Sequence, residues 1–463
     1  MSVRNRILAG VAGLALSIGM ALPASGESLA DALAAAYRNS NLLEQNRALL
    51  RAADEDVQQA VAALLPVVNF TATALSQLNA PLSNATLSVG LSASMTLLDF
   101  GRGSRSVAAT RETVMATRAG LVSVEQNVLL NAVTAYMTLY SDLQAVSLQR
   151  NNVTVITQQL RAARERFELG DSTRTDVALA EARLAASRSA LALAQGNVAI
   201  DREVFNLAVG MYPSSLDSPP SLPRLPATLE AAQEVARQNH PSISQVQHQV
   251  AVADLLTEII QRQRYGTVTG SISAEHSRSR VQGLPDSDGS DIVARLGYSV
   301  PLYTGGAQSS AERQQVAQAQ AQRSNLHQTM AIVRQSVAAS WAQLQIARAS
   351  VVASDQQISA TQSAYDAVRA EAELGSRTTL DVLDAEQELL DARSSRIAAA
   401  ANVQLAAYSL LASMGQLTVE ALNLGIPTYD VEAYGAGLRH APAPATRSRQ
   451  GDALDRIMGR YNR

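Results

Sequence analysis

The chain has no cysteine, which excludes disulfides, thiolate metal ligands, a cysteine nucleophile and a lipid-modified N-terminal cysteine. Aromatic residues make up only 4% of its 463 residues, so a core built around large rings is excluded and helices packed through small side chains are expected. The net charge of −3 provides no basic face for nucleic acid. Because only five scattered histidines are present, we expect no metal site, and nothing in the sequence calls for a cofactor.

The N-terminus has the three parts of a secretory signal. Arginines near the start precede an apolar run over 7–22, and Pro23 is followed by small residues up to Gly26. The alternative is a single membrane anchor, but the run has about 16 residues where roughly 20 are needed. No later stretch is apolar enough to cross a bilayer as a helix. We therefore expect cleavage of residues 1–26 and a mature protein that is periplasmic, secreted or embedded in an outer membrane as strands.

Proline placement and an internal duplication set the organisation of the chain. The proline-free stretches 82–212 and 302–426 can hold long helices, because proline costs about 3 kcal/mol in a helix interior. The sequence from Glu168 to Val177 resembles that from Glu373 to Val382, and other matches share the same offset. Two copies of one structural element are therefore expected. The expected parts are a first repeat over 27–213, a second repeat over 227–426, and a flexible tail over 427–463 that is rich in Pro, Ala, Arg and Gly.

Within each repeat the hydrophobic period changes from helical to alternating. Odd positions from Leu87 to Leu97 are apolar, whereas even positions from Thr86 to Thr96 are polar or glycine, as in a strand with one apolar face. Four strands cannot close a barrel, so either a small sheet packs on its own helices or several chains share a transmembrane barrel. Strands of about 10 residues suit a tilted membrane crossing and favour the barrel. The four strands are expected over about 67–76, 86–98, 266–275 and 291–303.

The long helices have the patterns of coiled coils. Residues 104–168 show unbroken helical spacing, which corresponds to about 100 Å of helix. The next helix has two apolar heptad series on opposite sides, one from Val177 to Phe205 and one from Leu179 to Leu207. Such a helix touches a neighbour on each side, as a ring of helices requires. An ordinary buried bundle helix is the alternative.

This arrangement and three motifs resemble the TolC family of outer-membrane efflux proteins. The motifs read LLDFGR from Leu97, LYTGG from Leu302 and LGSRTTLDVLDA from Leu374, and the resemblance covers about residues 27–426. It implies a homotrimer in which three chains share a twelve-stranded outer-membrane β-barrel, continued across the periplasm by a twelve-helix α-barrel. The implied function is a passive exit duct for drugs or proteins, in multidrug efflux or type I secretion. The implied partners are outer-membrane lipid, a periplasmic adaptor and an inner-membrane pump of RND, ABC or MFS type.

The turns that end the long helices are the candidate functional site. Each helix ends in Leu-Gly, where glycine is the expected cap, and Thr173 with Asp176, like Thr378 with Asp381, forms a capping box at the start of the next helix. Capping therefore explains these two aspartates as well as a functional role does. It does not explain Asp384, one turn after Asp381. Around a threefold axis the carboxylates of Asp381 and Asp384 would gather at one mouth.

The resemblance assigns roles to these turns. In the family, acidic residues at these positions form the periplasmic constriction, and an arginine at the position of Arg377 pairs with a Thr-Asp of the other repeat. Ala372 stands where TolC itself has a tyrosine, so either the lock is weaker or Phe167 or Arg174 contributes. The expected gate residues are Thr175, Asp176, Arg377, Asp381 and Asp384, and the expected adaptor-binding tips are Leu169, Gly170, Asp171, Leu374, Gly375 and Ser376.

The absence of a phosphate-loop pattern at Gly305-Gly306 and of clustered histidines argues against an enzyme. A structural or adhesive coiled-coil surface protein without transport is the alternative to the duct. It would explain the heptads but neither the duplicated strand pairs nor the acidic tips.

Overall fold

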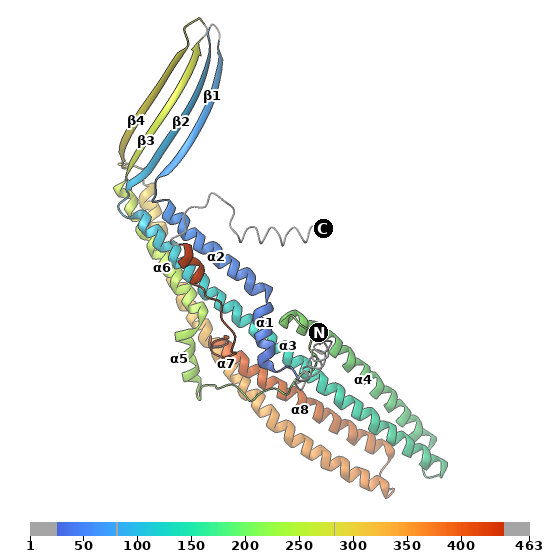
Figure 1. Cartoon of the computed structure of the whole chain (residues 1–463). Helices are drawn as coiled ribbons and strands as arrows, with labels where there is room; N and C mark the ends of the chain where they lie inside the picture. The colour runs from blue at the N-terminus through green and yellow to red at the C-terminus, as the bar shows by residue number, and fades with distance from the viewer. Residues whose placement is uncertain (1–25, 80–81, 282, 439–463) are drawn as a thin grey trace, which may run out of the picture. The chain divides into compact units, whose positions relative to one another are not determined.

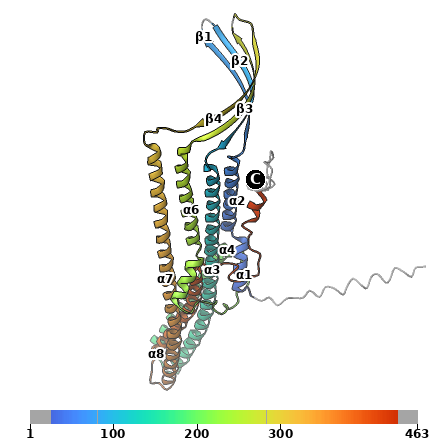
Figure 2. The same ribbon diagram turned by 90° about the vertical axis from the view of Figure 1, so that its left-hand side faces the viewer.

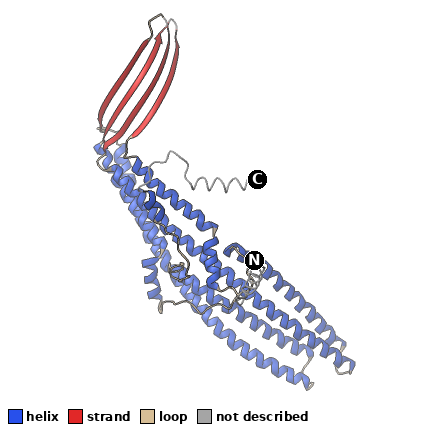
Figure 3. Ribbon diagram, viewed as in Figure 1, coloured by secondary structure: helices blue, strands red, loops and turns tan. Residues whose placement is uncertain are grey.

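The computed structural model describes residues 26–79, 82–281 and 283–438, which are mostly helical with one antiparallel sheet (Figures 1 and 3). The expected signal segment lies outside the described residues except for Gly26. The chain divides into two compact units. The tip unit comprises the described residues up to Ser40, Val128–Leu225 and Ser340–Leu410. The sheet unit comprises Asn41–Asn127, Pro226–Ala339 and the described residues from Leu411.

All four expected strands are present, in the order β1-β2-β3-β4. All four extend further toward their hairpin turns than the apolar pattern indicated, because ladder hydrogen bonds continue where the side chains become polar. The expected end of the last strand at residue 303 is wrong: the strand stops at Ser299, ahead of Pro301, which has no N–H to donate. The strands are β1 (Val67–Asn79), β2 (Leu82–Leu98), β3 (Thr267–Val281) and β4 (Ser287–Ser299).

The register sorts the sheet into one apolar and one polar face. Phe70 pairs with Leu91, Leu91 with Ala274, and Ala274 with Ile292, so one apolar row crosses all four strands. The neighbouring row, on the opposite face, is Thr71, Gly90, Glu275 and Asp291. Phe70 and Ile292 are 72% and 78% exposed. The apolar face is therefore not covered by the described helices, which contradicts the alternative of a sheet packed on its own chain.

In the sheet unit, α6 lies between parts of α3 and α7 (Figure 2). Glu112 of α3 contacts His248 of α6 at 2.7 Å, and Asp254 of α6 accepts from Arg323 of α7 at 2.8 Å. Among the described residues, no helix combines the length and apolar character that crossing a membrane requires. The helices of this unit are α2 (Asn41–Ala62), α5 (Leu229–Asn239), α6 (Pro241–Arg262), η1 (Gln263–Tyr265), α9 (Ala433–Leu438) and the nearer parts of α3 (Arg102–Glu168) and α7 (Ala307–Glu373).

The first described part of the expected tail packs on α2. Tyr434 of α9 donates to the Glu55 carboxylate at 2.7 Å, and Glu432 pairs with Arg118 of α3 at 3.3 Å. The Arg47 guanidinium lies over the Tyr429 ring, 5.2 Å from its centroid. Residues 427–438 therefore differ from the flexible segment expected there, because short-range polar contacts fix them to the sheet unit. The chain after Leu438 lies outside the described residues.

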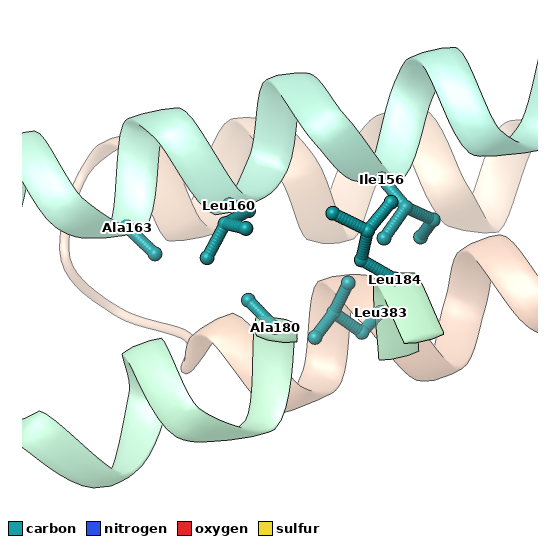
Figure 4. Close-up of a cluster of buried hydrophobic side chains, with 6 residues drawn as sticks. All are labelled: Ile156, Leu160, Ala163, Ala180, Leu184 and Leu383. Carbon is teal, nitrogen blue, oxygen red and sulfur yellow. The ribbon is translucent and has the colours of Figure 1, made fainter. Parts of the chain in front are cut away.

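The tip unit is held by small apolar clusters between helices. Ile156 and Leu160 of α3, Ala180 and Leu184 of α4, and Leu383 of α8 form one buried cluster (Figure 4). A second cluster joins α7 to α8 through a different face of α8, so α8 contacts helices on two sides, as the heptad series predicted for its counterpart α4. The helices of this unit are α1 (Leu29–Asn39), α4 (Arg174–Val209), nearly all of α8 (Thr379–Ser413) and the remaining parts of α3 and α7.

Candidate functional site at the helix tips

The first tip, residues 168–173, is a tight turn with an exposed apolar side chain. Gly170 has φ +86°, a backbone conformation that strains residues with a side chain. The Asp171 N–H donates to the Arg166 carbonyl at 2.9 Å, which completes a Schellman-type cap on α3. Leu169 is 77% exposed, and a Cβ added to Gly170 would meet no atom of the described part of the chain within 4 Å. This tip presents open space beside an exposed leucine.

The second tip, residues 373–378, repeats this geometry on α7. Gly375 has φ +77°, and the Ser376 N–H donates to the Glu371 carbonyl at 3.0 Å. Leu374 is 86% exposed, and the space beside Gly375 is open as well. The duplicated sequence therefore produces two equivalent turns.

Both predicted capping boxes are present. The Asp176 carboxylate accepts from the Thr173 N–H at 2.9 Å, and the Asp381 carboxylate accepts from the Thr378 N–H at 2.9 Å. Hydrogen bonds from Thr173 lower the pKa of Asp176. Hydrogen bonds from Thr378, with the charge of Arg377, lower the pKa of Asp381. Both carboxylates are therefore negative at neutral pH, whatever else they do.

Arg377 has a partner within its own turn. Its Nε donates to the Glu371 carboxylate at 2.8 Å, and this contact raises the pKa of Arg377. In the described chain it therefore pairs with Glu371 and not with Thr175 or Asp176, so pairing of these residues between chains stays a prediction. Ala372 packs against the cluster of Tyr365, Val382 and Leu389.

Asp384, which capping did not explain, pairs with an arginine that our sequence reasoning missed. Arg183 of α4 donates to the Asp384 carboxylate of α8 at 2.6 Å. This ion pair connects α4 to α8. It lies next to Leu383 of α8, which packs against α3 and α4 in the apolar cluster. The sequence did contain a pattern that could have indicated Arg183. It lies seven residues after Asp176, which puts both side chains on one side of α4.

Glu386 is a second missed residue. It is only 7% exposed, and its Oε2 has no hydrogen-bond partner among the described residues. Burial raises its pKa to about 7 against the opposing charges of Arg369 and Arg393. It lines a cavity of about 170 Å³ together with Asn152 and Ser187. The signal was its place in a 4-3 apolar spacing between Val382 and Leu389, where a coiled coil normally has an apolar residue.

The described residues contain no group of three or more His, Cys, Asp or Glu side chains placed to hold a metal ion. The tip unit contains charged and ionisable side chains: the aspartates that cap two helices, ion pairs between helices, and the buried carboxyl group of Glu386. Such an arrangement can hold helix ends in one position and release them when the pairs break.

Comparison with known proteins identifies relatives that cover most of the chain. A family model described as outer membrane efflux protein matches residues 32–210 and 233–416. Outer membrane efflux protein BepC of Brucella suis is 33% identical over 413 residues, or 89% of this chain and 90% of that protein. Outer membrane protein TolC of Escherichia coli is 25% identical over 88% of this chain and 87% of that protein. A solved structure of CusC has the same fold, with a TM-score of 0.72 at 19% identity over 84% of this chain and 92% of that one.

Proposed function

The chain belongs to the outer membrane efflux protein family, and from this premise we propose that its two helix tips form the periplasmic gate and the adaptor-docking end of an export duct. The protein is an outer-membrane efflux or secretion channel that extends into the periplasm. The observation that carries the gate proposal is the Arg183–Asp384 ion pair, because it links helices on either side of the place where the tips would separate. The duct would let cargo through without changing it chemically.

A trimer is the assembly that the sheet supports. The outer edges of β1 and β4 pair with no other strand of the described chain, and the apolar face is open. Three copies would supply twelve strands, remove all free edges and place the apolar face against lipid. A mass measurement of the detergent-extracted complex checks this, because a monomer or a soluble filament would contradict the shared barrel. A filament would instead favour the coiled-coil surface protein.

The proposed gate combines attraction within the closed tips with repulsion across the mouth. Arg377 would hold neighbouring tips together through Thr175 and Asp176. Asp381 would repel its symmetry copies, and so would Asp384 once its pair with Arg183 breaks. Neutral replacement of Arg377 and Asp176 should raise single-channel conductance in a planar bilayer. Alanine at Asp381 and Asp384 should remove block by multivalent cations. Unchanged conductance in the first variant, with the trimer intact, would mean that something else closes the tips.

The proposed docking surface is the pair of tips themselves. Two equivalent turns in each chain would give six around a trimer, each with an exposed leucine beside an open glycine. This surface suits the end of a helical hairpin from a periplasmic adaptor, which would connect the duct to an inner-membrane pump. The residues proposed to contact it are Leu169, Gly170, Asp171, Leu374, Gly375 and Ser376.

A further inference from the structure

The apolar face of the sheet changes character along β3. Ile272 and Ala274 belong to this face, and the same alternation continues it through His276, Arg278 and Arg280. These three basic residues lie toward the β3–β4 turn, at the end of the strands away from the helices. Side chains of this face point to lipid in a membrane barrel, because the polar row of Glu275 and Asp291 faces the lumen.

The basic residues form a cluster with two carboxylates. Arg280 binds Asp286 through two parallel hydrogen bonds of 3.0 Å, and Arg278 reaches the same carboxylate at 3.2 Å. His276 lies 3.2 Å from Asp288. Two guanidinium groups thus share one carboxylate, and they remain 60% and 72% exposed. Asp288, which lies opposite Arg278 in the β3–β4 register, balances the second guanidinium charge, and the two arginines keep N–H donors that Asp286 does not use.

An apolar groove lies directly beside this cluster. Its volume is about 350 Å³, and His276 and Ser290 are part of its lining. The Nδ1 of His276 is 2.9 Å from the Ser290 hydroxyl, which fixes the polar side of the groove. The apolar side chains that line it are Phe70, Val89, Leu91, Ala274 and Ile292.

The height of the cluster matches the outer boundary of the membrane. The helices lie in the periplasm, so the β3–β4 turn is on the cell-surface side. Arg278 follows Val268 by ten positions. These positions span about 34 Å along a strand and about 26 Å across a membrane at a tilt near 40°, close to the roughly 25 Å of an apolar barrel band. Arg278 and Arg280 therefore lie where the phosphates of outer-leaflet lipids are found.

We propose that this face binds a phosphorylated glycolipid of the outer leaflet, with an acyl chain in the groove and a phosphate on Arg278 and Arg280. The exposed guanidinium donors and their position at the height of the lipid phosphates select this occupant, since guanidinium groups bind phosphate oxygens through paired N–H donors. A neutral lipid would satisfy the groove but leave the arginine donors unused. Because the groove crosses all four strands, every chain of a barrel would hold one such lipid.

Native mass spectrometry of the full-length, detergent-extracted protein tests this site. The probes are a bis-phosphorylated lipid A and the same lipid after removal of both phosphates. The wild-type protein should prefer the phosphorylated form by about tenfold or more. Arg278→Gln with Arg280→Gln should abolish the preference. Arg295→Gln is the matched control, because it removes a cation from the lumen face of β4 and should leave the preference unchanged.

Ala274→Phe should fill the groove and weaken binding of both lipids. An unchanged preference in the double arginine variant, or equal binding of the two lipids to the wild-type protein, overturns the proposal. An equal loss in Arg295→Gln also overturns it, since net charge would then explain the effect. If the double variant does not assemble, Arg280→Gln alone is measured, and an unchanged preference there overturns the site.

Discussion

Arg183 and Asp384 are 38% and 55% exposed, so each copy of this ion pair contributes only about 0.5–1 kcal/mol. Three copies that break together would amount to about 2 kcal/mol, roughly thirtyfold in an opening equilibrium. Arg183→Asp should therefore raise the open probability in a planar bilayer, and Asp384→Arg added to it should restore the closed state. The double reversal tests the contact itself and not the loss of a charge.

The matched control for this reversal is the Arg164–Glu181 pair. It has the same length, 2.6 Å, and similar exposure, but it joins α3 to α4 within one hairpin. Arg164→Asp should leave gating unchanged. If it opens the channel as much as Arg183→Asp does, the effect is one of net charge at the mouth.

Glu386 should make the tip unit less stable as pH rises. Its pKa is raised by burial from an ordinary value near 4.5 to about 7, so the folded state holds a proton that the unfolded chain loses first. This contribution is fully present below pH ~4.5 and is lost as pH rises through ~7, at a cost of up to about 3 kcal/mol. Glu386→Gln should flatten thermal stability between pH 5 and 8. The exposed Glu388→Gln is the control, and a pH dependence that persists in Glu386→Gln would contradict the assignment.

The two tip turns depend on backbone conformation, and replacements can separate geometry from docking. Tryptophan at Gly170 or Gly375 should abolish export, because its side chain would occupy the surface proposed to dock the adaptor. Trimers and membrane insertion should survive, because the space beside both glycines is open and the change strains only the turn, by about 1–2 kcal/mol. Asparagine, which tolerates positive φ, should retain more export. Export is measured by cargo release from whole cells. Survival of export in both tryptophan variants would make the tips structural turns only.

The internal duplication does not make α4 and α8 equivalent at the ion pair that joins them. Asp384 of α8 corresponds to Leu179 of α4 under the internal offset, so only one repeat can supply this carboxylate. The repeats share the turn and its cap, whereas the ion pair between α4 and α8 uses residues that the repeats do not share. Gating asymmetry between the two tips follows from this difference.

For the whole molecule, processing should leave Glu27 as the first residue. The Glu27 N–H donates to the Ser215 carbonyl at 2.8 Å, and the Tyr136 hydroxyl donates to the Glu27 carbonyl at 2.9 Å. Glu27 is therefore tied into the tip unit, and cleavage beyond it would remove these contacts. Mass spectrometry of the purified outer-membrane fraction should give a mature chain that begins near Glu27. Recovery in the inner membrane with the first 26 residues retained would contradict the expected signal.

The sequence by itself determined the elements of the fold, because each is specified by a local pattern. Alternation gave the strands and their apolar face, heptads gave the long helices, and Leu-Gly followed by Thr-x-x-Asp gave the two tips with their caps. The duplication at a constant offset predicted that the tips would be equivalent. The family resemblance, which rests on contiguous motifs, was likewise visible without coordinates.

Only the tertiary structure decided which distant side chains meet. Arg183 and Asp384 are 201 positions apart, and the hydrophobic period of a single helix does not show that α4 and α8 come into contact at these residues. The burial of Glu386 depends on three helices at once, so its raised pKa has no local cause. The cluster at Arg278 and Arg280 needs the β3–β4 register, and the packing of residues 427–438 needs the surface of α2. Contacts across the chain are set by packing geometry, and a one-dimensional pattern contains no such distance.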